Sequence, residues 1–326
     1  MCVRVLQITK ELFRSGSGAV MLAQRRSDGQ VVVLKERRSA ELGVKEDILH
    51  EVNLLWGLSH PNIIRCYGYF WWAFLNHGVS SDISRSTLYI VLEYADAGDL
   101  YQEVQRRKTH GEYFTEEEVF DVFDQCCQGL QYLHDRSIVH RDIKTLNILR
   151  CRAPDGRLVV KLADLGVGRR MGQNTLVLQT FYGTPLYASP ELCDNKQYTA
   201  KTDIWSLGVV LYELAALEPP FTGRSIMALA KVICRGEYAP LPSRYSRGLT
   251  RLIGTMLNVE HTQRPSAKRI LGWLKDRPRA STSAPVEPAA PLPAPAPPSR
   301  DPAPHHHGVP VVRVRRREGE AAPPSR

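Results

Sequence analysis

Apolar positions in the first hundred residues form the short runs that are typical of β-strands. The run Val31–Leu34 follows the turn residues Ser27–Gly29, which together predict a hairpin. A second run, Leu88–Leu92, predicts another buried strand. Between the two runs, three apolar residues recur at helical spacing: Ile48, Val52 and Leu55. This part of the chain is expected to be β-rich with a short helix.

After about residue 100 the apolar period lengthens to that of helices. Thr115–Glu118 has the pattern of a capping box, and one apolar helical face follows it: Val119, Val122, Phe123, Cys126, Leu130 and Leu133. A small hairpin turned at Gly156 is expected between Ile148–Leu149 and Leu158–Val160. Asp203–Leu217 is apolar almost all round, which predicts a buried helix. The pattern therefore predicts a small β-rich lobe followed by a larger helical lobe.

Composition favours a globular protein of the cell interior. The chain has 326 residues, of which 43% are hydrophobic, so it has room for one bilobal unit or two small domains. Its seven cysteines show neither metal-type spacing nor the framework of a small secreted domain, which is typical of a reducing compartment. No apolar run has the length of a signal peptide or a membrane span. We expect a soluble, intracellular, cytoplasmic protein without a membrane partner.

The net charge of +9 raises the question of nucleic-acid binding. The 43 Lys and Arg residues are spread along the chain and are not interleaved with aromatic residues. A solvated basic surface explains this distribution better than a nucleic-acid interface. The positive net charge would still favour acidic or phosphorylated partners.

The composition changes sharply near Arg279. Residues 280–326 hold 12 of the 22 prolines and show no helical or strand period, so this segment is expected to be a disordered tail. Pro288–Pro291 and Pro295–Pro298 match the PxxP pattern of SH3-type ligands, although a match arises easily by chance in so proline-rich a segment.

The strongest chemical signal is the segment His140–Asn147, followed by Asp164-Leu165-Gly166. Phosphoryl transfer needs a carboxylate for the proton of the incoming hydroxyl, a cation near the transferred group and oxygen ligands for Mg²⁺. Asp142 is the candidate carboxylate and Lys144 the candidate cation. Asn147 and Asp164 are the candidate metal ligands. Either motif alone could be a turn or cap, but the two together point to phosphoryl transfer.

These motifs resemble those of eukaryotic protein kinases, and their local sequences are similar to those of the NIMA-related (Nek) family of serine/threonine kinases. The supporting segments are His50–Leu55, His60–Ile64, Leu88–Tyr94 with Gly98–Leu100, His140–Leu149, Asp164–Arg169 and Gly183–Glu191. The resemblance implies a bilobal α+β kinase domain over residues 8–275, which would use ATP and Mg²⁺. It divides this domain into an N-lobe over 8–92, a hinge over 93–95 and a C-lobe over 96–275.

The resemblance also assigns roles around the nucleotide. Lys35 would contact the α- and β-phosphates and form an ion pair with Glu51. Leu92 would be the gatekeeper, and backbone groups of the hinge, from Glu93 to Ala95, would bind adenine. Three further residues would have structural roles, Asp203 bracing the catalytic loop and Glu191 forming a buried salt bridge with Arg264.

Substrate class and regulation follow from the same resemblance. Lys144, with Thr184 beside it, is typical of serine/threonine kinases, so protein substrates with Ser or Thr acceptors are expected. Thr180 matches the activation-loop threonine of Nek-like kinases. Its phosphate, from an upstream kinase or from autophosphorylation, would order the loop through Arg141.

The glycine-rich loop departs from the family pattern. Its three glycine positions fall at Phe13, Ser15 and Gly18, so only the last is kept. The expected nucleotide contacts here come from Leu12, Ser15, Gly16, Ser17, Gly18 and Val20. Without the first two glycines, the backbone N–H groups of the loop approach the phosphates less closely. We therefore expect a raised KM for ATP. The alternative is a pseudokinase scaffold that binds ATP weakly.

The resemblance also suggests a centrosomal, ciliary or nuclear location.

Overall fold

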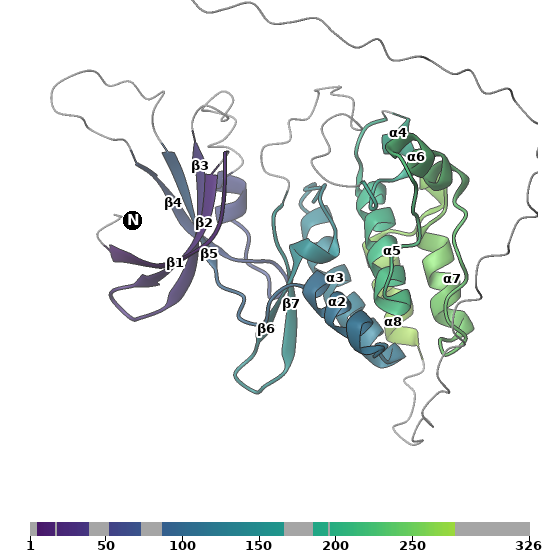
Figure 1. Ribbon diagram of the computed structural model, residues 1–326, viewed down its shortest axis with the longest axis horizontal. Coiled ribbons are helices and arrows are strands. Elements are labelled where there is room, and N and C mark those ends of the chain that lie inside the picture. The colour runs from purple at the N-terminus through teal and green to yellow at the C-terminus, as the bar shows by residue number, and fades with distance from the viewer. Residues whose placement is uncertain are drawn as a thin grey trace, which may run out of the picture. The chain divides into compact units, whose positions relative to one another are not determined.

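The computed structural model describes residues 5–16, 18–38, 52–72, 87–165, 185–194 and 196–277 of the chain. All of them belong to one structural unit, Met1–Ala280. Within it, a β-sheet lies at one end and the helices at the other (Figure 1). The predicted arrangement of a β-rich first lobe and a helical second lobe is confirmed. The predicted tail over 280–326 lies outside the described residues.

The first lobe is built on a five-stranded antiparallel sheet in the order β1-β2-β3-β5-β4. Its strands are β1 (Leu6–Ser15), β2 (Gly18–Arg25), β3 (Val31–Arg38), β4 (Cys66–Trp72) and β5 (Thr87–Glu93). The predicted runs Val31–Leu34 and Leu88–Leu92 lie in β3 and β5, and residues 52–56 form a short helix.

Strand register divides the sheet into two faces. Val20 lies opposite Lys35, and Lys35 lies opposite Ile90. Directly paired residues share a face and neighbours along a strand alternate, so these three side chains lie together on one face. The alternate positions, including Met21 and Leu34, form a buried apolar cluster on the other face. On the face of Lys35, Ile90 and Leu88 of β5 pack in a second apolar cluster with Val52, and Lys35 lies beside it.

The second lobe is helical. Its helices are α2 (Leu100–His110), α3 (Glu116–His134), α4 (Pro190–Cys193), α5 (Ala200–Ala216), α6 (Ile226–Arg235), α7 (Arg247–Met256) and α8 (Ala267–Asp276), with the short 3₁₀ turns η4 (Thr145–Asn147) and η5 (His261–Gln263). The predicted capping box begins α3: Glu118 N donates to Thr115 Oγ1 at 3.2 Å, and Thr115 N donates to Glu118 Oε2 at 2.7 Å. The apolar face predicted for this helix is buried.

Helix α5 passes through the core of the second lobe. It begins at Ala200 and not at the predicted Asp203, because Thr199 caps it and accepts a hydrogen bond from Lys201 N. Every residue from Thr202 to Ala215 is buried, which confirms the all-round burial expected from the sequence. Trp205 stacks on Phe221 with ring centroids 5.4 Å apart.

A small hairpin lies between the sheet and the helices (Figure 1). It consists of β6 (Ile148–Arg152) and β7 (Leu158–Leu162), turned at Gly156 with a left-handed φ of 82°. Isolated bridges join Leu149 to Asp99 and Leu162 to Ile63, so the hairpin is tied to the chain on both sides. The predicted hairpin is confirmed. The first chemical motif ends directly before β6, and the second begins just after β7.

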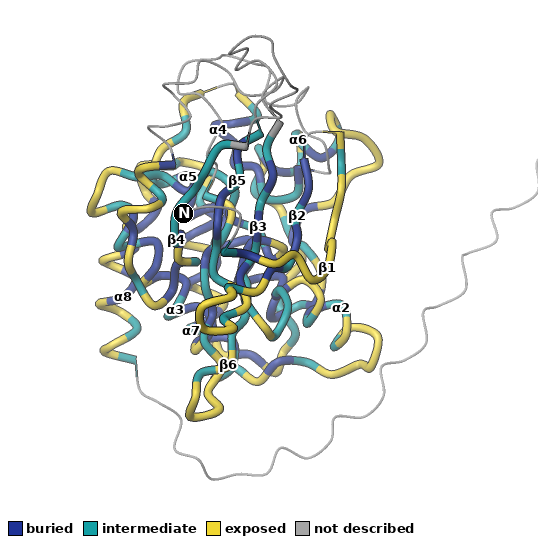
Figure 2. The backbone as a smooth tube through the Cα atoms, turned by 90° about the vertical axis from the view of Figure 1, so that its left-hand side faces the viewer, coloured by how far each residue is buried: buried dark blue, intermediate teal, exposed yellow. Residues whose placement is uncertain are grey.

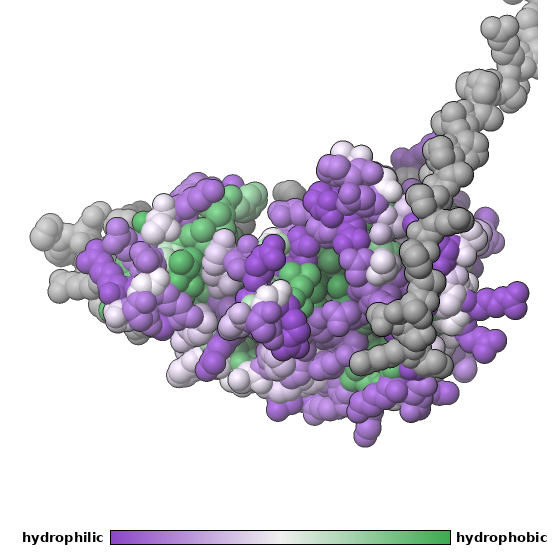
Figure 3. All heavy atoms as spheres, turned by 90° about the horizontal axis from the view of Figure 1, so that it is seen from below, coloured by the Kyte–Doolittle hydropathy of each residue, from purple (hydrophilic) through white to green (hydrophobic). Residues whose placement is uncertain are grey.

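On the face seen in Figure 3, most of the surface is hydrophilic, and hydrophobic areas lie in its left-hand part and near its centre. Among the described residues, no helix combines the length and the apolar character needed to cross a membrane.

Candidate active site

Asp203 at the start of α5 holds the backbone of the segment His140–Asn147. Its carboxylate accepts hydrogen bonds from His140 N (2.9 Å) and from Arg141 N (3.0 Å). Arg141 has a left-handed φ of 68°, a conformation that is unfavourable for a residue with a Cβ and persists only where surrounding contacts impose it. The bracing role predicted for Asp203 is therefore confirmed.

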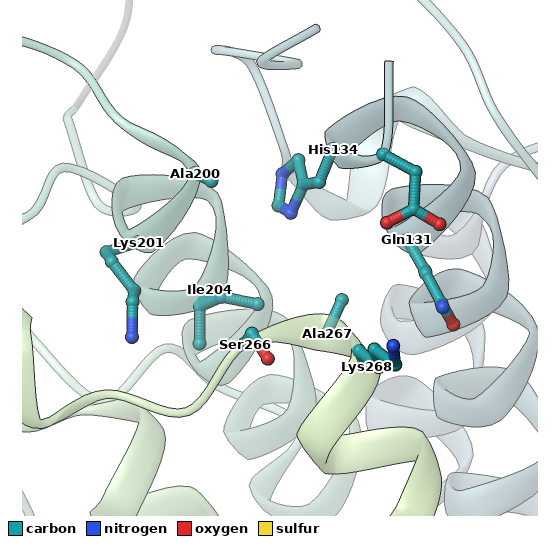
Figure 4. Close-up of a pocket in the computed structure, with 9 residues that line it drawn as sticks. Gln131, His134, Ala200, Lys201, Ile204, Ser266, Ala267 and Lys268 are labelled. Carbon is teal, nitrogen blue, oxygen red and sulfur yellow. The ribbon is translucent and has the colours of Figure 1, made fainter. Parts of the chain in front are cut away.

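A third contact extends this arrangement to α3. His134 Nε2 lies 2.8 Å from Asp203 Oδ2. His134 also lines a cavity of about 110 Å³ between α3, α5 and α8, where its ring lies beside Ala200, Ile204 and Ala267 (Figure 4). None of the residues that line this cavity is a predicted site residue.

Three predicted catalytic residues meet around one carboxylate oxygen. Lys144 Nζ donates to Asp142 Oδ2 at 2.8 Å, and Asn147 Nδ2 donates to the same oxygen at 2.8 Å. Asn147 Nδ2 also donates to the backbone oxygen of Asp142 at 2.8 Å. These bonds orient the carboxylate and leave its other oxygen, together with the amide oxygen of Asn147, for other partners.

The neighbouring imidazole of His140 supports the same loop from within the core. Burial lowers the pKa of His140, although the charges of Asp203, Asp142 and Asp164 act in the opposite direction. The ring is therefore neutral near pH 7, and its Nδ1 can accept a hydrogen bond from Asp142 N, 3.4 Å away.

Asp164 joins this cluster from the end of β7. Ala163 N donates to the backbone oxygen of Asn147 at 2.9 Å, so Asp164 follows directly after a contact with the catalytic segment. Its side chain forms an ion pair and hydrogen bond with Lys35 Nζ of β3. Loss of solvent acts to raise the pKa of Asp164, but the charges of Lys35, Arg37 and Lys144 outweigh it and lower the pKa.

The tip of the first lobe is the hairpin between β1 and β2. Ser15 lies opposite Gly18, and Gly16 is in the turn. A side chain at Gly18 would overlap the backbone carbonyl oxygen of Glu36, so only glycine allows β2 to approach β3 this closely. Val20 follows on the face of Lys35.

The predicted hinge connects β5 to α2. Glu93 ends β5, and its carboxylate contacts Lys161 Nζ at 3.1 Å and accepts a hydrogen bond from Arg65 N at 3.1 Å. Ala95 lies in the connection that follows. Just beyond it, Ala97 N donates to Arg150 O at 3.0 Å, which ties the connection to β6.

Three predicted site residues lie outside the described residues: Ser17, Glu51 and Thr180. The same holds for Thr184, the predicted neighbour of Asp142 and Lys144. The structure thus brings together Lys35, Asp142, Lys144, Asn147 and Asp164, while the ion pair of Lys35 with Glu51 and the role of Thr180 stay predictions.

One buried network was not predicted from the sequence. Tyr187 OH lies 2.9 Å from Thr145 Oγ1 and donates to Glu213 Oε2 at 2.5 Å. Burial raises the pKa of Tyr187, and the adjacent Glu213 adds to this effect. A buried glutamate in the apolar run of α5 was the available signal, since such a group needs a hydrogen-bond donor.

The predicted salt bridge between Glu191 and Arg264 is confirmed. Arg264 donates through Nη1 and Nη2 to the two carboxylate oxygens at 2.7 and 2.8 Å, and both side chains are buried. It joins α4 to the segment before α8 and so supports the core around the site.

The sequence of the chain matches that of a known protein family. A family model described as "Protein kinase domain" matches residues 7–273 of the chain. The chain belongs to the protein kinase family. The predicted resemblance to NIMA-related kinases is confirmed by this kinase domain's relatives.

These relatives carry names of NIMA-related serine/threonine kinases. The domain is 41% identical over 265 residues to "Probable serine/threonine-protein kinase nek3" of Dictyostelium discoideum, which covers 80% of this chain and 22% of that protein. It is 39% identical over 270 residues to "Serine/threonine-protein kinase Nek2" of Homo sapiens, covering 80% and 58%. With "Serine/threonine-protein kinase Nek5" of Homo sapiens the identity is 38% over 266 residues, covering 81% and 35%. The kinase thus spans less than two thirds of the length of these relatives.

The residues of this chain fit the cofactors that the family implies. Mg²⁺ prefers oxygen ligands and needs only one or two protein side chains beside phosphate oxygens. The carboxylate of Asp164 and the amide oxygen of Asn147 supply such a set, with Lys35 as a cation for the phosphates. Among the described residues there is no cluster of three or more His, Cys, Asp or Glu that would suit a transition metal.

Proposed function

We propose that this chain is a Mg-ATP-dependent protein serine/threonine kinase of the NIMA-related type, which transfers the γ-phosphate of ATP to Ser or Thr hydroxyls of proteins. The observation that carries the proposal is the contact of Lys35 with Asp164 beside the cluster of Asp142, Lys144 and Asn147. It joins a cation of the first lobe to the oxygen ligands and the candidate base of the second.

In this proposal Asp142 receives the proton of the acceptor hydroxyl. Lys144 and Asn147 both donate to Oδ2, so the carboxylate is oriented and Oδ1 can accept from the substrate. Lys144, within salt-bridge distance of Asp142, stabilises the charge that builds up on the transferred group. A positioned base of this kind contributes about 10²–10⁴-fold to the rate.

Asp164 and Asn147 would hold Mg²⁺, which neutralises phosphate charge and orients the phosphates when it is bound. The lowered pKa of Asp164 keeps its carboxylate ionised near neutral pH, as a metal ligand must be. Lys35 contacts Asp164 directly and therefore lies where it can also reach phosphate oxygens.

Regulation and location rest on the resemblance. We propose that phosphorylation of Thr180 acts through Arg141, whose backbone Asp203 holds. An intracellular location, with the cytoplasm, centrosome, cilium or nucleus as alternatives, follows from the cysteine pattern and the family. A partner of SH3 type for the proline-rich tail stays a prediction from its composition.

The decisive experiment measures transfer of radiolabelled phosphate from ATP to a Ser/Thr-containing protein, followed by phosphoamino-acid analysis. We expect incorporation on Ser or Thr, falling to background in Asp164→Ala. Asp155→Ala, in the exposed β6–β7 turn, is the matched control and should keep full activity. Equal incorporation by Asp164→Ala and the parent chain would refute the proposed site, and phosphotyrosine as the product would refute the proposed acceptor.

A further inference from the structure

Strand β1 carries two exposed apolar side chains next to the hairpin tip. Leu12 is 48% and Phe13 is 62% exposed. Most of β1 is exposed, as Figure 2 shows, and it is one of the two edge strands of the sheet. A large aromatic side chain that stays open to solvent at the edge of a catalytic site suggests a contact with a ligand.

The register places the side chain of Phe13 on a definite face. A bulge lies between Glu11 and Phe13, because Glu11 pairs with Met21 and Phe13 pairs with Val20. In a bulge, two residues of one strand oppose a single residue of the other, and Leu12 is the extra residue here. Phe13 therefore lies opposite Val20, with Leu12 next to it in the bulge.

This face is the one that carries Lys35. Val20 lies opposite Lys35 across β2 and β3, so the two share a face. The next pair at the tip, Arg14 with Ala19, belongs to the other face, where Ala19 is part of the buried apolar cluster. Lys35 in turn reaches Asp164, so Phe13 lies on the face of the sheet that is directed to the catalytic residues.

We propose that Phe13 is a specificity-determining residue of the nucleotide site, where its ring, with Leu12 and Val20, covers the nucleoside half of the bound purine nucleotide. The inference rests on the proposed function. Lys35 and Asp164 supply the charges for phosphate and metal, which leaves the apolar tip of the same face for the uncharged half of the ligand.

The ring also changes which half of the nucleotide dominates binding. A glycine at this position would let backbone N–H groups approach the phosphates, and a side chain at Phe13 prevents that approach. An aromatic ring against a base or sugar provides apolar and stacking contact instead. Recognition therefore shifts from the phosphates toward the nucleoside.

The test measures the Kd of adenosine and of Mg-ATP by calorimetry on the full chain. Phe13→Ala should raise both values by about five- to tenfold, and by the same factor, because both ligands contain the nucleoside. Phe13→Gly should raise the Kd of adenosine equally but that of ATP less, because glycine lets backbone groups approach the phosphates. Ile8→Ala, at another exposed apolar position of β1, is the matched control and should change neither value.

An unchanged adenosine Kd in Phe13→Ala would overturn the inference, as would an equal effect of Ile8→Ala. If Phe13→Ala does not fold, Phe13→Leu replaces it: a rise of about twofold or more supports the ring contact, and no rise overturns it. These binding measurements do not depend on catalysis. Phe13-dependent adenosine binding without Asp164-dependent transfer would refute only the proposed function, and the reverse result would refute only this inference.

Discussion

Replacing Asp203 by asparagine tests how the second lobe positions the catalytic segment. The buried carboxylate accepts from His140 N, Arg141 N and His134, and an asparagine of the same shape keeps only one of the two oxygens. Its amide nitrogen would then face a hydrogen-bond donor. One buried N–H group, on His140 or on Arg141, loses its partner.

The magnitude follows from the bonds that are lost. A hydrogen bond to a charged group contributes about 1.5–3 kcal/mol, and a buried donor without a partner costs about 1–3 kcal/mol. The left-handed conformation of Arg141 costs about 1–2 kcal/mol, which the bond from its N–H to Asp203 offsets. Loss of that bond is therefore enough to release the strain. We expect the free energy of unfolding to fall by about 2–4 kcal/mol.

The assay combines urea unfolding with steady-state phosphotransfer. Asp203→Asn should lower kcat by about 10²-fold, because a shift of about 1 Å at Asp142 is sufficient for such a loss. The KM for ATP should change little, since Lys35 lies in the other lobe. Asp121→Asn, at an exposed position of α3, is the control and should match the parent chain. A destabilised Asp203→Asn variant with parental kcat would refute the positioning argument.

Three further outcomes follow from the buried contacts. Arg264→Met leaves the buried Glu191 without its partner, so the free energy of unfolding should fall by about 3–5 kcal/mol; an unchanged urea midpoint would contradict this. Gly18→Ala forces a Cβ against the Glu36 carbonyl, so the KM for ATP should rise and thermal stability should fall. Parental values of both quantities would show that β2 and β3 can separate freely. Burial acts to raise the pKa of Glu191, but Arg264 lowers it below the value of 4.5 for the free side chain. Its stabilising contribution is complete above pH 4.5 and is lost as the pH falls through the lower folded pKa, so unfolding midpoints of the parent should decline more steeply in acid than those of Glu191→Gln; parallel curves would rule this out.

Local signals explain why much of the fold was predictable. The capping box at Thr115 and the apolar period after it depend only on neighbouring residues, and both are present in α3. The start of α5 was misplaced because the apolar run begins directly after Asp203, whereas Thr199 provides the cap. A pattern of apolar residues marks the buried part of a helix and misses a polar first turn.

Strand register and contacts between the lobes were harder to predict. The family pattern placed Phe13 at a glycine position, but the bulge that brings Phe13 opposite Val20 depends on the pairing of two strands. The contact of Lys35 with Asp164 joins residues from separate lobes. Such contacts depend on the packing of the whole chain, and short motifs do not specify it.

The hydrogen bonds of the Tyr187 hydroxyl limit both its reactivity and the movement of the backbone at residue 187. It is enclosed between Thr145 and Glu213, and its raised pKa keeps it un-ionised at physiological pH. Both of its hydrogen bonds would have to break before this oxygen could react with a modifying enzyme. A backbone displacement at residue 187 would break the hydrogen bond to Glu213. The buried carboxyl group of Glu213 would then keep Thr145 as a donor and lose Tyr187.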